Sequence, residues 1–188
     1  MRWVTLLAGF LMVVASSSAS GCGSDAESSS QAKSDLTPLL LKDGELPGYK
    51  RSGEPYVQTD ASKWASENRG GDDAKRLNAL GFVAGAPADL KNANGKAGLT
   101  LVERFPSSAA ASKELAHATA DHPNLKRFPV PGIPIAVGFE AAGSPGGRNI
   151  AFTKESTYYL VGHLLDESAP TVEALIATAQ RQYQRAAR

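Results

Sequence analysis

The sequence predicts an α+β fold: an antiparallel sheet of about five strands with helices packed on one face. Apolar residues alternate with polar ones in short runs within three stretches, 82–105, 135–139 and 149–165. Two segments with helical periodicity, 107–120 and 168–188, follow the first and the last of these stretches. A lipoprotein signal peptide and a flexible tether are predicted to precede this domain.

Residues 1–21 are the predicted signal peptide. Arg2 supplies a positive start, an apolar run of about 12 residues follows, and three small residues at 19–21 stand directly before Cys22. Cys22 is the only cysteine among 188 residues. This order resembles a bacterial lipobox. The resemblance implies that a diacylglyceryl group is attached to the Cys22 sulfur, that the chain is cut before Cys22, and that a further acyl chain such as palmitate can follow.

Two other interpretations of this segment stay open. An uncleaved transmembrane anchor needs roughly 20 apolar residues, more than the run of about 12 found here. Ordinary secretion with cleavage after Ala19 fits the Ala-Ser-Ser-Ser-Ala stretch at 15–19. It would leave Cys22 as a lone thiol in an oxidising compartment, which is unfavourable. We therefore expect lipidation of Cys22 and a location on the extracytoplasmic face of the cell membrane.

Residues 22–35 form the lipidated cysteine and a Ser-rich tether without large apolar side chains. Residues 36–188 form a single α+β domain, long enough to bury one core without a disulfide. Once Arg2 is removed with the signal peptide, 19 Lys and Arg face 19 Asp and Glu. A neutral chain without a basic run argues against nucleic-acid binding. The membrane contact is therefore expected to come from the lipid on Cys22.

The first part of the domain is predicted to hold short helices. A helical turn is expected within 36–41, and Leu-Pro-Gly-Tyr at 46–49 then turns the chain. Asp60 can cap one helix, and Asp72 or Asp73 can cap a second.

The strand segments follow. Residues 82–86 and 97–105 suggest a hairpin with a long connection over 87–96. Residues 107–120 are Ala-rich and form a helix. Three prolines within 128–134 exclude a helix and favour an extended crossing or an edge strand.

The C-terminal part contains further strands at 135–139, 149–154 and 157–165, and then the most regular helix. Ser168 can cap this helix, with Pro170 in its first turn. Its apolar stripe follows the i, i+3, i+4, i+7, i+11 pattern with Val172, Leu175, Ile176, Ala179 and Tyr183. Two segments of the chain show a weak similarity, because each leads from strands into a helix. This similarity implies two hairpin-plus-helix units that share one sheet, with both helices on the same face.

No motif for catalysis, metal or cofactor binding is found, so we expect a non-catalytic protein with no cofactor and no metal site. His117, His122 and His163 lack the close spacing typical of zinc ligands, and no further cysteine can join them. Gly-Ser-Pro-Gly at 143–146 lacks the Gly-x-Ser-x-Gly spacing of a hydrolase nucleophile.

An apolar groove is the candidate ligand-binding surface. Phe128 and Ile133 of the Pro-rich segment, together with Tyr158 and Tyr159, would line it if they meet in the fold. The alternative is that these four residues are core residues packed under a helix.

Several short motifs occur together along the chain. They are the lipobox at Cys22, the Ser-rich tether, Leu-Pro-Gly-Tyr at 46–49, Phe-Pro-Val-Pro-Gly-Ile-Pro at 128–134, Tyr-Tyr-Leu-Val-Gly at 158–162 and the closing helix with Tyr183. This combination resembles uncharacterised lipoproteins of high-GC Gram-positive, actinobacterial type. The resemblance implies a cell-envelope location and brings no catalytic residue.

We therefore expect a monomeric, lipid-anchored, extracytoplasmic envelope protein that binds a small ligand or a cell-wall component without catalysis. The alternative is an accessory protein that docks on a membrane enzyme, transporter or sensor. A concave apolar pocket would favour the first hypothesis. An exposed apolar patch without a cavity would favour the second.

Overall fold

A computed structural model describes most of the predicted domain. The described residues are 35–69, 73–120, 125–141, 146–165 and 169–186. They belong to one compact unit, Asp35–Arg188. The predicted signal peptide and Cys22 lie outside the described residues. Within the described ranges, no helix combines the length and apolar character needed to cross a bilayer.

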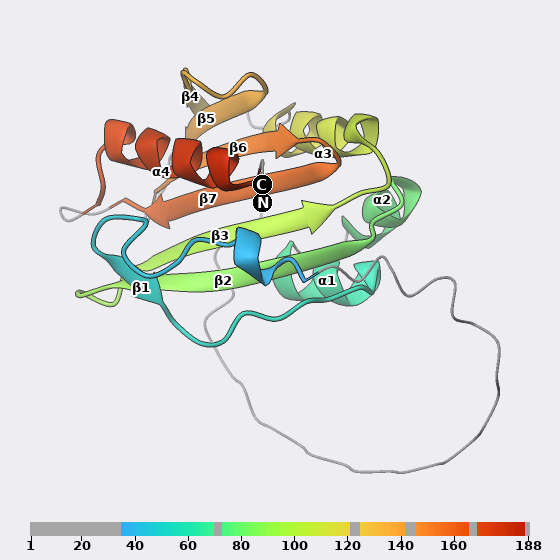
Figure 1. Ribbon diagram of the computed structural model, residues 1–188, viewed down its shortest axis with the longest axis horizontal. Helices are drawn as coiled ribbons and strands as arrows, with labels where there is room; N and C mark the ends of the chain where they lie inside the picture. Colours follow the sequence, from blue (N-terminus) through green and yellow to red (C-terminus); the bar gives the residue numbers. More distant parts are fainter. Residues whose placement is uncertain (1–34, 70–72, 121–124, 142–145, 166–168, 187–188) are drawn as a thin grey trace, which may run out of the picture. The chain divides into compact units, whose positions relative to one another are not determined.

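The unit has an α+β fold built on one sheet (Figure 1). The strands are β1 Tyr49–Arg51, β2 Ala84–Asn92, β3 Ala97–Arg104, β4 Leu125–Phe128, β5 Ala136–Ala141, β6 Gly147–Lys154 and β7 Thr157–Leu164. The helices are the 3-10 turn η2 Thr37–Leu39 and the α-helices α1 Ala61–Asn68, α2 Ala74–Ala79, α3 Ser108–Ala120 and α4 Val172–Arg185.

The sheet has seven strands in the order β1-β2-β3-β7-β6-β5-β4, and each neighbouring pair is antiparallel. The sequence predicted an antiparallel sheet but only about five strands. The two strands it missed, β1 and β4, are the edge strands, with three and four residues. So short a strand shows too little alternation to be recognised from its sequence.

Strand β2 is also longer than predicted, because it runs through Pro87, which was assigned to a loop. The backbone of Gly85 bonds to Gln58 and the carbonyl of Asp89 accepts from Ser52, so both residues direct their polar groups away from β3. Pro87 lies midway between them and has the same orientation. Its missing N–H therefore interrupts no bond to β3, as for a proline on an edge strand.

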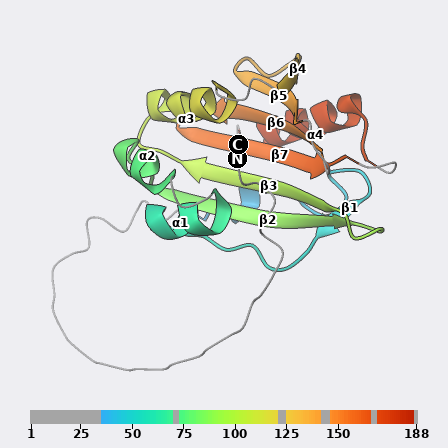
Figure 2. The same ribbon diagram turned by 180° about the vertical axis from the view of Figure 1, so that it is seen from behind.

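The helices cover both faces of the sheet, which corrects the prediction that they pack on one face. Figure 1 shows α4 in front of β6 and β7, and Figure 2 shows α1, α2 and α3 on the opposite face. Two separate clusters of buried apolar residues reflect this division. The α4 face holds Leu36, Leu40, Ile150, Phe152, Tyr159, Val161, Leu175 and Ala179. The α1–α3 face holds Trp64, Leu77, Leu101, Phe105, Ala111, Leu115, Tyr158 and Leu160.

The two hairpin-plus-helix units resemble each other only in the order of their elements along the chain. Strands β2 and β3 lead to α3, while β6 and β7 lead to α4. A two-fold axis normal to the sheet would exchange the antiparallel neighbours β3 and β7 and would leave both helices on one face. The helices lie on opposite faces, so no such symmetry relates the two units.

The helix starts follow from local capping. Asp60 accepts from the backbone N–H groups of Ser62 and Lys63 at 2.8 and 2.9 Å, as predicted for α1. Helix α4 begins later than predicted. Thr171 has extended backbone angles and its hydroxyl accepts from Ala174 N at 3.2 Å, so it is the N-cap and Pro170 precedes the helix.

Candidate functional site

A pocket forms where the Pro-rich segment ends the pairing between β5 and β6. The last pair of these strands at this end joins Ala136 to Phe152, and Thr153 N donates once more to Ile135 O at 3.1 Å. In this register Pro134 would direct its N–H away from β6, so its missing donor breaks no bond of the ladder; the pairing ends because the chain before β5 bends out of the strand. Among the described strands, none pairs with the outer edge of β6 beyond Thr153.

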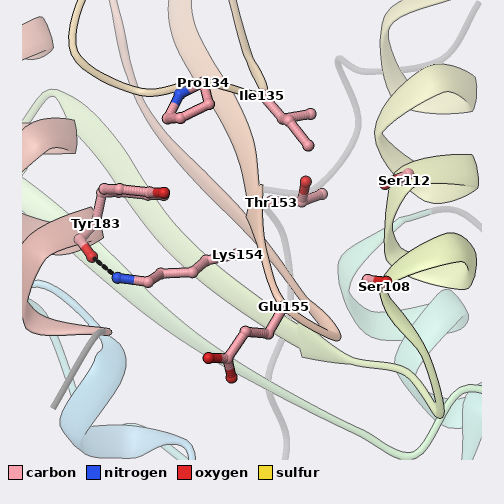
Figure 3. Close-up of a pocket in the computed structure, with 8 residues that line it drawn as sticks. All are labelled: Ser108, Ser112, Pro134, Ile135, Thr153, Lys154, Glu155 and Tyr183. Carbon is pink, nitrogen blue, oxygen red and sulfur yellow. Dashed lines mark hydrogen bonds between the residues drawn. The ribbon is translucent and has the colours of Figure 1, made fainter.

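The pocket has a volume of about 250 Å³ and lies between α3 and α4 at the end of β6 (Figure 3). Its lining residues are Ser108, Ser112, Pro134, Ile135, Thr153, Lys154, Glu155 and Tyr183. Figure 3 shows the two serines on α3 at one side and Tyr183 of α4 at the other. Ile135 is 52% exposed and contributes apolar surface to the lining.

Lys154 is held in place at one wall. Its ammonium donates to the backbone carbonyl of Tyr183 at 2.9 Å and lies 4.3 Å from the centre of the Tyr183 ring. The ring face attracts the cation. An ammonium group has three donors, so two N–H groups remain in addition to the one that the carbonyl accepts. The site therefore presents a positioned positive charge beside an aromatic surface.

Glu155 has an unusual backbone conformation. It occupies the first position of the two-residue β6–β7 turn with φ of 52°, and it is the single non-glycine residue with positive φ in the described part of the chain. Such a conformation costs roughly 1 kcal/mol or more for a residue with a Cβ atom. A glycine would adopt it more easily. The chain instead places a carboxylate at the rim of the pocket.

A second hollow of about 540 Å³ near β1 is lined by four charged residues together with Gly53 and Pro55. Its arginine, Arg51, already donates to Leu41 O at 2.6 Å, and Arg51 N donates to Asp43 at 2.7 Å. These groups hold the loop that leads into β1. The pocket beside Lys154 is therefore the better candidate for a ligand site.

The four residues predicted to bind a ligand do not meet in one groove. Ile133, Tyr158 and Tyr159 are at most 5% exposed, and Tyr158 lies on the α1–α3 face while Tyr159 lies on the α4 face. Phe128 ends β4 and packs partly buried against the α4-face core. Tyr159 stacks on Phe152 with a centroid distance of 4.7 Å. These placements are those of core residues, the alternative that the sequence left open.

The histidines are dispersed. His163 is 3% exposed on the α4 face, with Nδ1 3.0 Å from Leu164 O. His117 lies on α3 with Nε2 3.9 Å from Asp73. His122 and Ser144 lie outside the described residues. Among the residues that are described, no group of three or more His, Cys, Asp or Glu side chains is arranged to hold a metal ion.

The sequence did not reveal a cluster of charged side chains buried on the α1–α3 face. Glu103 of β3 and Glu114 of α3 are both fully buried. Arg69 donates to both oxygens of Glu103, at 3.0 and 2.8 Å, and its Nη2 lies 3.6 Å from Glu114. Arg76 of α2 bonds to Glu114, and the indole of Trp64 donates to Glu103 at 2.6 Å. The cluster thus joins α1, α2 and α3 to the sheet.

The electrostatics of this cluster favour ion pairs over neutral groups. Burial alone would lower the pKa of Arg69, but the interactions with Glu103 and Tyr158 together outweigh burial and raise that pKa above its ordinary value. Burial also raises the pKa of Tyr158, whose ring lies 5.1 Å from the Arg69 guanidinium. The cluster is enclosed by protein, so its role is to fix the helices rather than to bind a ligand.

A signal for Glu103 was present in the sequence. Leu99, Leu101 and Phe105 occupy alternate positions, and Glu103 falls in the same register, which places a carboxylate on an inward-facing strand position. Arg69 and Arg76 gave no such signal, because both lie next to loop and helix ends where charged residues are common.

Comparison with known proteins gives a match at the level of fold. No family model matches the chain, and none of the curated proteins matches it significantly. The extracellular domain of PknH from Mycobacterium tuberculosis is similar in structure, with a TM-score of 0.53 at 14% sequence identity. The match covers 81% of this chain and 95% of that domain. At this identity, the likeness establishes a shared fold and no shared residue function.

Proposed function

We propose that this protein is a lipid-anchored envelope protein of actinobacterial type that binds a small ligand without catalysis. The pocket beside Lys154 and Glu155 is the observation that carries the proposal. It is concave, it combines an apolar wall of Pro134, Ile135 and Tyr183 with a few polar groups, and its volume of about 250 Å³ lies just below the range typical of drug-sized ligands, which suits a smaller molecule.

The extracytoplasmic location has two supports. The small residues before Cys22 predict lipidation and export. The fold is similar to that of a domain described as extracellular, although at low identity. A Cys22→Ser variant is expected to remain an uncleaved precursor that incorporates no labelled fatty acid. Normal processing of that variant would contradict the lipid anchor.

Ligand binding can be tested by native mass spectrometry of the full chain after gentle extraction from its own envelope. We expect a reproducible small-molecule adduct on the wild-type protein. A Ser108→Trp variant should fill the pocket and lose the adduct. Lys113→Trp is the matched control, because Lys113 is an exposed residue of the same helix outside the pocket lining.

The alternative function predicts a different spectrum. An accessory docking protein should be recovered without an adduct and in a complex with another protein, and Ser108→Trp should not change that complex. Tyr56 and Val57 are the exposed residues that would favour this alternative, at 43% and 38% exposure. They are two adjacent residues and do not form a large apolar patch, so the pocket remains the stronger argument.

A further inference from the structure

The pocket carries one charge of each sign. Lys154 and Glu155 are the two ionisable residues with a full charge at neutral pH among its lining residues. A ligand that is only an anion or only a cation would be attracted by one of these groups and repelled by the other. A ligand that carries both charges is attracted by both, provided that they are separated along its length.

The edge of β6 adds backbone groups to this pair of charges. Thr153 directs its N–H outward to Ile135 O. Lys154 pairs with Thr157 at the β6–β7 turn, so its carbonyl faces β7, and the N–H of Glu155, in the same trans peptide unit, points to the opposite side. Strand β5 begins at Ala136, and its pairing with β6 does not extend to Glu155. This short free edge suits a ligand with a peptide or amino-acid backbone.

The volume limits the size of the ligand. A cavity of about 150 Å³ holds benzene in an apolar protein interior, so a pocket of about 250 Å³ admits roughly ten non-hydrogen atoms. The apolar wall of Ile135, Pro134 and Tyr183 leaves room for small side chains such as methyl groups. Long or branched ligands would extend beyond the lining residues.

We propose that this pocket binds a small peptide-like zwitterion, an amino acid or a dipeptide. The carboxylate of the ligand lies at the Lys154 ammonium, and the ammonium of the ligand lies at the Glu155 carboxylate. The inference rests on the proposed function of the pocket and names the chemical class of its ligand. It also gives a reason for Glu155 at a turn position that glycine would occupy at lower cost, because the carboxylate is needed there.

The test is isothermal titration calorimetry of the full-length protein in detergent micelles, with alanyl-alanine in its L,L and D,D forms as the probe. Two capped probes accompany it: N-acetyl-alanyl-alanine, which lacks the ammonium, and alanyl-alanine amide, which lacks the carboxylate. We expect one of the two free dipeptides to bind and each capped form to bind about tenfold or more weakly, since each cap removes one charge-assisted contact.

The variants assign each end of the ligand to one residue. Lys154→Met should abolish the preference for the free carboxylate while the preference for the free amine is kept. Glu155→Gln should abolish the preference for the free amine and keep the preference for the free carboxylate. Glutamine is nearly identical in size to glutamate, so the turn is left unchanged. Lys113→Met and Glu54→Gln are the controls, because both residues are exposed and lie outside this pocket. Both controls should bind as the wild type does.

The outcomes separate the inference from the proposed function. Binding of the dipeptide with no effect of either cap overturns the zwitterion and leaves a peptide-binding pocket. Failure of every dipeptide, together with an envelope adduct that Ser108→Trp removes, overturns the zwitterion and keeps the ligand-binding function. Failure of every dipeptide with no such adduct overturns both.

Discussion

The two faces of the central sheet differ in the polar contacts that are buried beneath their helices. On the α4 face, the buried polar side chains of the helix are neutral and bond to backbone carbonyls of the N-terminal segment. Thr178 donates to Glu45 O at 2.9 Å and Gln182 donates to Leu39 O at 2.9 Å. On the α1–α3 face, the contacts are ion pairs, with two fully buried carboxylates, Glu103 and Glu114.

The apolar content of the helices explains the difference. Helix α4 presents Leu175 and Ala179 to the core, with Ile176 and Tyr183 beside them. Helix α3 contributes mainly alanines, and an alanine buries little apolar area. Ion pairs inside a protein add little net stability but cost much when one partner is removed. The ion pairs of the α1–α3 face therefore stabilise the fold only when all partners are present. The α4 face is instead stabilised by apolar burial with a few neutral polar contacts.

The largest expected effect comes from breaking the charged set. Arg69→Met leaves Glu103 buried without its guanidinium and should lower the free energy of unfolding by about 3–5 kcal/mol. Urea denaturation of the full-length protein measures this change. The double variant Arg69→Met, Glu103→Gln removes both charges and keeps an acceptor for Trp64, so it should recover more than half of the loss. A double variant as unstable as Arg69→Met would contradict this account.

The next effect compares two glycines, one against each face. A Cβ atom on Gly85 would lie 2.6 Å from the fully buried Trp64 ring, while one on Gly98 would lie 3.0 Å from the Tyr49 ring. Gly85→Ala should therefore destabilise by about 1–3 kcal/mol through overpacking. Gly98→Ala should cost less in the same denaturation experiment. The reverse order would show that the α4 face is the more rigid one.

A smaller effect is expected at the centre of the α4 face. Gln182 is 1% exposed and donates to Leu39 O and to the Thr100 hydroxyl, at 2.9 and 3.2 Å. Gln182→Leu keeps the volume but leaves both acceptors without this donor, so a loss of about 1–2 kcal/mol is expected. Hydrogen exchange of residues 36–46 should also become faster. Gln184→Leu, on an exposed position of the same helix, should change neither quantity.

The smallest effect is a pH dependence at the end of α4. Burial would raise the pKa of Glu45, but the hydrogen bonds from Arg185 and from Lys42 N outweigh it, so this pKa lies below its ordinary value of 4.5. Glu45 therefore stabilises the fold above about pH 4.5, and this stabilisation is lost as the pH falls through its lowered pKa.

Glu45→Gln should thus make stability less dependent on pH on the acid side and leave its slope near neutral pH unchanged. Denaturation midpoints measured from pH 3 to pH 7 compare the two proteins, and about 0.2–1 kcal/mol is typical of partly exposed pairs. An unchanged acid side in the variant would rule out this contribution.

The sequence predicts local elements better than it predicts their arrangement. Even local predictions were not all correct. Asp60 was correctly predicted as the N-cap of α1, whereas Ser168 was predicted as the N-cap of α4 in place of Thr171. The strands of the two central hairpins were found because Leu101, Ile150 and Phe152 lie in alternating runs. The two edge strands and the distribution of helices over both faces depend on contacts between distant residues, and periodicity carries no information about them.

None of the four residues predicted to bind a ligand, Phe128, Ile133, Tyr158 and Tyr159, lines the candidate pocket. Three prolines predicted that 128–134 is an extended crossing or an edge strand; the edge strand β4 ends at Phe128, and Pro134 of this segment lines the pocket. The sequence gave no sign that Ser108 of α3 and Tyr183 of α4 would face the same hollow as Lys154, because they come from three separate elements. The aromatic residues that looked suited to a ligand belong to the core.

The attachment of the N-terminal segment beneath α4 also has a mechanical consequence. The described chain begins at Asp35, and Leu36 is already fully buried in the α4-face core. Arg185 and Gln182 bond to the carbonyls of Leu40 and Leu39. A tensile load applied to the chain ahead of Asp35 would reach these contacts before it reached any strand. The contacts between this segment and α4 would thus break first, while the antiparallel sheet stays intact.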